Sequence, residues 1–228
     1  MEVDSTIRRQ KLDQFVKDNK DAFTEWELMR IRDYIKRDAH DLFVPDLMRE
    51  IYDELGLLTE EQDIYTGFMS LLGDAFPYRE RKILEVGGGI FPRLGKRISK
   101  EQTTGSITVY DPRLCVREQD TPKMKLIRKK FHQNDSIGDH NLMIAFMACE
   151  GAEQLLDAAC KNKCDFMVGF CEGGPHGDGY DFYEDEEEWL HCMMYIAESG
   201  VRDHRMGKVK EKELKQYGDP YPVIYNER

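Results

Sequence analysis

The chain has no long apolar run. Nowhere in its 228 residues does a stretch approach the ~20 apolar residues that a helix needs to cross a bilayer. The first residues, MEVDSTIRRQKLDQF, have no apolar core of the kind found in signal peptides. Low-complexity tracts and internal repeats are also absent, while 40% of the residues are hydrophobic and 34% are charged. We therefore expect a globular, cytoplasmic protein with no membrane partner.

The cysteines do not form a metal-binding or disulfide pattern. All six lie in the second half of the chain, and no two of them form a CxxC pair. This spacing favours reduced thiols that are buried as small hydrophobic groups. A zinc site built from Cys149, Cys160, Cys164 and Cys171 is disfavoured, because three of these residues fall at expected helix ends and strand interiors. We expect no metal.

Positive charge is in deficit. Lys and Arg number 33 against 44 Asp and Glu, which gives a net charge of −11. Such a chain repels a polyanion at long range, and this argues against a nucleic-acid partner. The short basic clusters at 96–97, 128–130 and 208–215 are interpreted as solvated ends of helices or strands.

The first third of the chain has helical periodicity. In VPDLMREIYDELGLL (44–58), apolar residues recur at helical spacing, and Gly56 stands where that helix would stop. Thr59 and Gln62 form a capping box for a following helix, whose inner face would extend from Ile64 to Phe76. We predict a helical N-terminal cap over residues 1–58 and one larger domain over residues 59–228.

From residue 82 the pattern changes to short apolar runs separated by polar helical segments. Such runs predict strands that are covered on both faces: KILEV (82–86), ITVYD (107–111), KMKLI (123–127), LMIAFM (142–147) and DFMVGF (165–170). Helical segments at 92–100 and 151–161 lie between some of these runs, and another helix is expected to end near Gly200. The alternation predicts an α/β fold with a doubly wound, mostly parallel sheet and helices on both faces. After Gly200 only YPVIY (221–225) is plainly strand-like, so a truncated or rearranged sheet stays open as an alternative.

Three consecutive glycines follow the first predicted strand. In a doubly wound sheet this turn contributes to the ligand site outside the carboxyl ends of the strands. Gly87, Gly88 and Gly89 would accept positive φ and let a ligand approach the backbone, although a tight turn without a ligand is an alternative. The dinucleotide fingerprint G-x-G-x-x-G is not matched, because Pro92 stands at the third glycine position and has no amide for a pyrophosphate.

Two acids at adjacent strand ends indicate the charge of the expected ligand. Glu85 would repel a diphosphate but would attract the ammonium and sulfonium groups of S-adenosylmethionine. Asp111 lies about 20 residues beyond the glycine turn, at a distance typical of an acid that binds ribose hydroxyls. Alternatively, Asp111 forms a turn before Pro112.

The sequence Glu85-Val86-Gly87-Gly88-Gly89, followed by Asp111, resembles the first two motifs of the class I S-adenosylmethionine-dependent methyltransferases. The resemblance covers about residues 60–200 as an order of elements. It implies a Rossmann-like fold in which the glycine turn cradles the methionine portion of the cofactor and Asp111 holds the ribose. Glu85, Gly87, Gly88, Gly89 and Asp111 are therefore the candidate cofactor-binding residues.

The candidate catalytic residues follow the fourth and fifth predicted strands. The N/D-P-P-Y/F sequence used by family members that methylate amide or adenine nitrogens is missing, and MACEG (147–151) stands in its place. Methyl transfer needs an in-line approach and sometimes a base, for which Glu150 is one candidate. The glycine-rich segment CEGGPHGDGY (171–180) offers Glu172, His176 and Asp178, which could orient or deprotonate an acceptor or bind a metal together. Each of these is alternatively an exposed turn residue.

Three functional hypotheses remain open. The first is an S-adenosylmethionine-dependent methyltransferase that acts on a small-molecule or protein acceptor. The second rests on Gly87-x-Gly89-x-x-Pro92, which is similar to the glycine turn of nicotianamine synthases, enzymes that transfer the aminobutyryl group of the same cofactor. The third is a catalytically silent cofactor-binding or protein-interaction module whose helical cap engages a partner. The sequence fixes neither the acceptor nor the oligomeric state.

Overall fold

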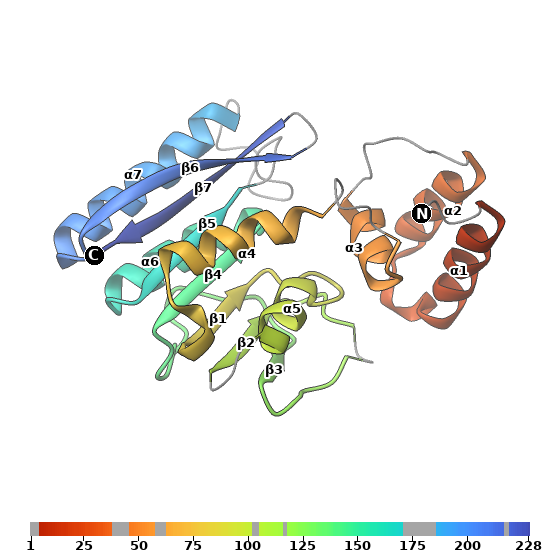
Figure 1. Ribbon diagram of the computed structural model, residues 1–228, viewed down its shortest axis with the longest axis horizontal. Coiled ribbons are helices and arrows are strands. Elements are labelled where there is room, and N and C mark those ends of the chain that lie inside the picture. The colour runs from red at the N-terminus through yellow and green to blue at the C-terminus, as the bar shows by residue number, and fades with distance from the viewer. Residues whose placement is uncertain are drawn as a thin grey trace.

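A seven-stranded sheet forms the centre of the protein (Figure 1). The computed structural model describes residues 5–37, 46–57, 63–101, 105–115, 118–170, 186–216 and 219–228. The strands are β1 (Lys82–Val86), β2 (Ser106–Tyr110), β3 (Met124–Ile127), β4 (Leu142–Phe146), β5 (Asp165–Gly169), β6 (Lys208–Gln216) and β7 (Asp219–Glu227). The α-helices are α1 (Ser5–Asp18), α2 (Glu25–Arg37), α3 (Asp46–Glu54), α4 (Ile64–Ala75), α5 (Arg93–Glu101), α6 (Cys149–Lys161) and α7 (Glu186–His204), and short 3₁₀ turns cover Lys20–Ala22 and Tyr78–Glu80.

The strand order is β3-β2-β1-β4-β5-β7-β6. Strands β1 to β5 are parallel to one another, whereas β7 runs antiparallel to both β5 and β6. The order reverses at β1, because β2 and β3 lie on one side of it and β4 and β5 on the other. The prediction of a doubly wound, mostly parallel sheet is confirmed. Such a reversal leaves a crevice outside the carboxyl ends of β1 and β4, where ligands bind in open α/β sheets.

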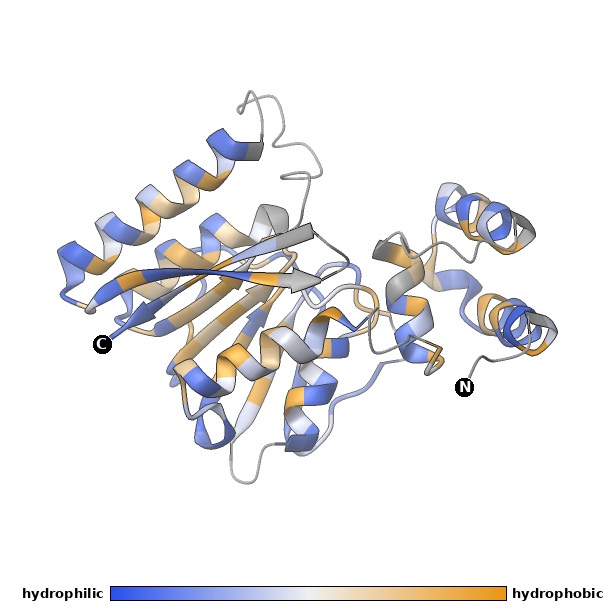
Figure 2. Ribbon diagram, turned by 45° about the horizontal axis from the view of Figure 1, so that its top comes forward, coloured by the Kyte–Doolittle hydropathy of each residue, from blue (hydrophilic) through white to orange (hydrophobic). Residues whose placement is uncertain are grey.

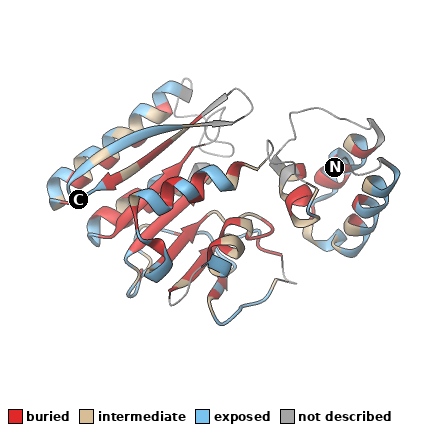
Figure 3. Ribbon diagram, viewed as in Figure 1, coloured by how far each residue is buried: buried red, intermediate tan, exposed pale blue. Residues whose placement is uncertain are grey.

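Helices cover both faces of the sheet (Figure 1). Along β1, Ile83 packs with α4 and α5, whereas Leu84 and Val86 point to the opposite face and pack with α6 and α7. Every residue of β4 and β5 is buried (Figure 3). The hydropathy colouring shows the same arrangement, with apolar strands between helices of mixed polarity (Figure 2). The central strands are mostly apolar because neither of their faces meets water.

The three N-terminal helices pack on one another beside the sheet (Figure 1). Their own core includes Leu12, Phe23, Ile31 and Ile51, and it also receives Phe91 from the segment after β1. The first third of the chain is therefore helical, as the periodicity predicts. The boundary at residue 58 falls outside the described residues and stays a prediction.

Two expectations about the C-terminal part are wrong. The sheet is not truncated, since β6 pairs with β7 along its whole length, from Lys208↔Glu227 to Gln216↔Asp219. Helix α7 does not end near Gly200 but continues to His204. Gly200 instead permits close packing against α6, because a Cβ at this position would lie 2.5 Å from Cys160 Sγ.

Helix α4 begins with a cap other than the one predicted. The side chain of Asp63 accepts hydrogen bonds from the backbone amides of Tyr65 and Thr66. These bonds satisfy two of the amide groups that the first turn of a helix leaves unpaired. The predicted capping box at Thr59 and Gln62 lies outside the described residues.

The described cysteines are free thiols, as predicted. Cys115, Cys160 and Cys164 are buried, and burial raises the pKa of the Cys160 thiol to about 11 and that of Cys164 to about 12. The side chains of Cys149 and Cys171 lie outside the described residues. Within the described ranges we find no helix with the length and apolarity needed to cross a lipid bilayer.

Candidate functional site

A cavity of about 210 Å³ opens where the order of the strands reverses. Its walls come from the glycine turn after β1, from Asp111 after β2, and from Met147 and Ala148 after β4. Helix α4 contributes Tyr65, and helix α3 of the N-terminal region contributes Glu50. The predicted cofactor-binding residues Glu85, Gly87, Gly88, Gly89 and Asp111 all line this one cavity. Their convergence follows from the topology, because parallel strands end at the same edge of the sheet.

A larger depression of about 840 Å³ lies between α4 and α5, away from the carboxyl ends of the strands. Several of its polar side chains already have partners: Arg97 binds Asp63, and the hydroxyl of Tyr78 donates to Glu101. The smaller cavity at the strand ends is therefore the stronger candidate for a binding site.

The glycine turn needs glycine at two positions. Gly87 and Gly89 have φ angles of +81° and +75°, in the left-handed region that side chains with a Cβ rarely adopt. A Cβ at Gly87 would also collide with the Cβ of Ala148, and a Cβ at Gly89 would lie 2.8 Å from Oε1 of Glu50. The turn thus brings the backbone close to both α3 and the end of β4.

The amides of this turn already have acceptors within the protein. Gly87 N–H donates to the carbonyl of Tyr110 (2.8 Å) and Gly89 N–H donates to Oδ2 of Asp111 (3.0 Å). The amides of Ile90 and Phe91 donate to Oε2 of Glu50, at 3.1 and 3.5 Å. A pyrophosphate would have to displace two carboxylates from these amides. The turn is therefore unsuited to a dinucleotide, in agreement with the sequence prediction.

Glu85 is the most isolated acid of the site. Its side chain is 2% exposed, and Oε2 has no hydrogen-bond partner among the described residues. Burial raises the pKa of this carboxyl to about 8, the Asp111 carboxylate raises the pKa further, and the Gly95 amide lowers it. Ionisation of a buried carboxyl without a partner is energetically unfavourable, and a neighbouring cation would stabilise the charged form.

Asp111 connects the turn to the segment after β2. Oδ2 accepts from Gly89 N–H, and Oδ1 accepts from Arg113 N–H at 2.6 Å. Burial raises the pKa of Asp111, while the two amides and the Arg113 guanidinium lower it. Asp111 lines the cavity, and its role in binding a ribose stays a prediction.

Glu50 brings a third carboxyl to the cavity from helix α3. Burial raises its pKa to about 8, even though Arg113 and the amides of Phe91 and Ile90 act in the opposite direction. The Arg113 guanidinium is itself bound by Glu27 of α2. Glu27 also completes a capping box with Thr24, whose amide and hydroxyl donate to Oε2 of Glu27. The N-terminal helices thus reach the cavity both directly, through Glu50, and through Arg113.

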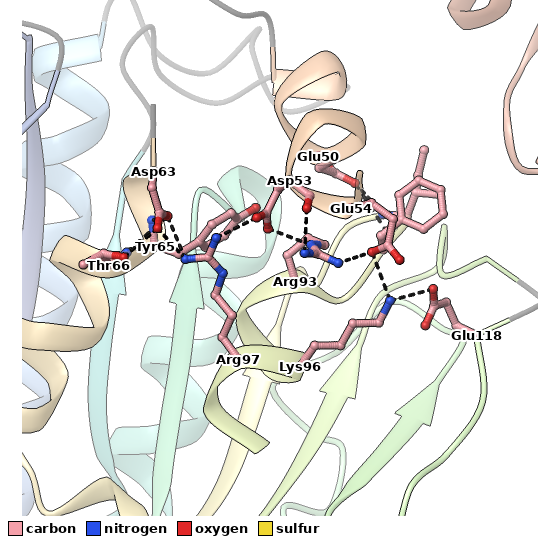
Figure 4. Close-up of polar contacts among 12 residues, drawn as sticks. Glu50, Asp53, Glu54, Asp63, Tyr65, Thr66, Arg93, Lys96, Arg97 and Glu118 are labelled. Carbon is pink, nitrogen blue, oxygen red and sulfur yellow. Dashed lines mark hydrogen bonds and ion pairs between the residues drawn. The ribbon is translucent and has the colours of Figure 1, made fainter. Parts of the chain in front are cut away.

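An ion-pair network fastens α3 to α5 (Figure 4). Asp53, which is 7% exposed, accepts from Arg93 Nε at 2.7 Å and from Arg97 at 2.6 Å. Glu54 binds Arg93 and Lys96. These pairs lie one turn beyond Glu50 on α3, and they hold its carboxyl against the glycine turn.

The fold is Rossmann-like. No known family and no curated protein sequence matches the chain. Solved structures to which the chain is similar include magnesium protoporphyrin IX methyltransferase from Synechocystis PCC 6803, with 10% identity, a TM-score of 0.47 and coverage of 98% of this chain and 100% of that one. Another is precorrin-6y C5,15-methyltransferase from Geobacter metallireducens, with 11% identity, a TM-score of 0.45 and coverage of 83% of this chain and 92% of that one. A third is an S-adenosylmethionine-dependent methyltransferase from Aquifex aeolicus, with 11% identity, a TM-score of 0.43 and coverage of 69% of this chain and 87% of that one. At these identities the likeness concerns the course of the chain alone.

The predicted catalytic residues are not brought together among the described residues. Glu172, His176 and Asp178 lie outside them. Glu150 belongs to the first turn of α6, two residues after Ala148 of the cavity wall, but its side chain is likewise not described. Within the described ranges, no three His, Cys, Asp or Glu side chains form a group that could hold a metal ion.

Sequence reasoning missed Glu50, Arg113 and Met147. Met147 has a φ of +59° directly after β4, which is uncommon for a residue with a long side chain and marks the strand end as a strained point of the site. Glu50 lies within a helical pattern that is defined by its apolar residues, and no local signal in the sequence marks its carboxyl. Its position at the cavity becomes evident only from its hydrogen bonds with backbone amides about 40 residues later in the chain.

Proposed function

We propose that the chain binds S-adenosylmethionine at the β1/β4 reversal and transfers its methyl group to a small-molecule or protein acceptor. The cavity of about 210 Å³ is smaller than the ~300–1,000 Å³ typical of whole ligand sites, so we assign to it the amino-acid and sulfonium end of the cofactor. The adenosine would lie on the Asp111 side, where a carboxylate can accept hydrogen bonds from ribose hydroxyls.

One observation carries the proposal. The protein's own carboxylates occupy the turn amides, while the buried oxygen Oε2 of Glu85 has no hydrogen-bond partner among the described residues. A site of this kind opposes phosphate groups and favours a ligand with positive charge. S-adenosylmethionine carries both an ammonium and a sulfonium group, and NAD offers a pyrophosphate instead.

The chain's own residues would orient the reaction rather than take part in covalent chemistry. The bound cofactor supplies an electrophilic methyl group on a sulfonium, and an acceptor must approach it in line. The cavity wall after β4, at Met147 and Ala148, is the side from which we expect the acceptor to approach. Glu150 follows this wall and is the first candidate for a base.

The first experiment is a calorimetric titration of the purified protein with S-adenosylmethionine, S-adenosylhomocysteine and NAD. We expect saturable binding of the first two and none of NAD. Asp111→Asn should weaken binding of both by roughly tenfold or more, because it removes a charge-assisted acceptor. Glu153→Gln, an exposed acid on α6, is the matched control and should bind like the wild type.

The released nucleoside separates the remaining hypotheses. Methyl transfer converts the cofactor to S-adenosylhomocysteine, whereas aminobutyryl transfer releases 5′-methylthioadenosine. Chromatography of incubations with candidate acceptors identifies which product forms. Binding without either product would favour the silent module, and absence of S-adenosylmethionine binding would refute the proposed function.

A further inference from the structure

Glu50 is a residue of the binding cavity that comes from outside the sheet domain. Helix α3 carries it, and its Oε2 accepts from the amides of Ile90 and Phe91. Its other oxygen, Oε1, lies against Gly89, since a Cβ there would be 2.8 Å away. No described side chain donates a hydrogen bond to Oε1. The carboxyl therefore spans from the start of α5 to the wall of the cavity.

A purely structural cap on these two amides would not require a carboxylate. A neutral amide oxygen can accept the same two hydrogen bonds, whereas a partly buried carboxylate is destabilised unless a cation is near. The charged or titratable groups that face Glu50 are Arg113, Asp111 and Tyr65. Arg113 is the one cation among them, and Glu27 already binds it.

The cavity contains more acidic than basic side chains, and a bound cation would favour the charged forms of these acids. Glu50, Glu85 and Asp111 line it together with Arg113 as the only Lys or Arg among the described lining residues. Glu85 is a second and independent indication that the cavity suits a cation, because it is 2% exposed and its Oε2 has no hydrogen-bond partner among the described residues. A positively charged, hydrogen-bonding group in the cavity would stabilise the charged forms of these acids.

We propose that Glu50 of helix α3 recognises the ammonium group of the amino-acid portion of the ligand, so that the N-terminal helices form part of the cofactor site. This inference rests on the proposed function. It makes Glu50 a specificity residue, which distinguishes nucleosides that carry a charged amino acid from those that do not. It also gives the ion pairs between α3 and α5 a role, since they hold Glu50 at the cavity.

The test compares two nucleosides on two variants. S-adenosylhomocysteine carries the ammonium group on a neutral thioether, whereas 5′-methylthioadenosine has the same nucleoside and a neutral thioether without the amino acid. This pair isolates the amino-acid portion, because the sulfonium charge of S-adenosylmethionine is absent from both. Glu50→Gln keeps an acceptor for the turn amides but removes the charge. Glu153→Gln, an exposed acid on α6 that lies outside both the cavity and the α3–α5 ion pairs, is the matched control. Thermal unfolding of both variants checks that the α3–α5 contact persists.

We expect Glu50→Gln to weaken binding of S-adenosylhomocysteine, and of S-adenosylmethionine, by roughly 10- to 100-fold while methylthioadenosine binding changes less than about twofold. Glu153→Gln should leave these affinities near the wild-type values. Equal weakening of both nucleosides by Glu50→Gln would show a structural role and overturn the inference. Unchanged S-adenosylmethionine binding would overturn it as well. If the wild type binds methylthioadenosine but not S-adenosylmethionine, or binds neither, the proposed function fails first and the role of Glu50 fails with it.

Discussion

The buried carboxyl of Glu85 should make the ligand-free protein less stable as the pH rises. Its pKa is about 8 in the folded protein, against an ordinary value of 4.5. The folded state therefore holds this proton more tightly than the unfolded state does. The resulting stabilisation is complete below about pH 4.5 and is lost progressively as the pH rises to about 8.

The size of the effect follows from these two values. Each pH unit within the window removes up to about 1.4 kcal/mol for one group. Between pH 6 and pH 8 the free energy of unfolding should fall by roughly 2 kcal/mol through Glu85 alone, because titration of the folded state begins to limit the loss near pH 8. Glu85→Gln replaces the protonated carboxyl with a neutral group of the same shape, so this part of the pH dependence should disappear.

Urea denaturation at pH 6 and pH 8 measures the effect as a difference between two proteins. The loss of unfolding free energy between the two pH values should be about 2 kcal/mol greater for the wild type than for Glu85→Gln. Histidines and acids remote from Glu85 contribute equally to both proteins and cancel. Glu153→Gln, whose acid is exposed, should retain the full wild-type dependence. Equal pH dependence in the wild type and Glu85→Gln would refute the assignment of Glu85 as a protonated, unpaired acid.

Three further changes test the framework around the site. Arg93→Ala should lower the unfolding free energy by about 2 kcal/mol in urea denaturation, because it leaves the buried Asp53 with fewer charged partners, and limited proteolysis should then cut the N-terminal helices sooner; unchanged proteolysis would contradict the fastening role. Asp165→Ala should lower the free energy of unfolding in urea by about 3–5 kcal/mol, since this 4% exposed acid binds two arginines and a buried asparagine. Lys82→Ala removes one side of an exposed ion pair and should leave the melting temperature unchanged. Gly87→Ala should destabilise by about 1–3 kcal/mol and abolish nucleoside binding in calorimetry, because it combines a positive φ with a collision at the strand end; a variant of wild-type stability would refute the strain argument.

The central part of the fold could be predicted because burial on both faces leaves a strong pattern in the sequence. KILEV and LMIAFM lie between two layers of helices, so most of their positions are apolar. The glycine turn was equally visible, since a positive φ beside a close backbone contact admits few other residues. Glu85 and Asp111 followed from their places at strand ends, and the topology brings both into one cavity.

The edge of the sheet could not be predicted in the same way. The sequence of β6, KVKEKELKQ, is dominated by charge, and most of its described side chains are exposed. Its strand conformation depends on the hydrogen bonds of its ladder with β7, which a local pattern of hydrophobicity does not report. Charged residues on an edge strand also oppose pairing with other chains, which explains why this strand does not resemble the buried ones.

Helix α3 shows that residues on one side of a predicted domain boundary can stabilise structure on the other side. Ile51 and Met48 place it in the core of the N-terminal helices, while Glu50 and Asp53 on its other side bind the glycine turn and α5. Without this helix, the amides of Ile90 and Phe91 would lose their hydrogen-bond acceptor. The basic side chains of α5 would also lose the carboxylates of α3 that neutralise them. The division predicted near residue 58 therefore describes the order of the elements along the chain. The stability of the turn, and with it the shape of the cavity, depends on residues from both sides of that division.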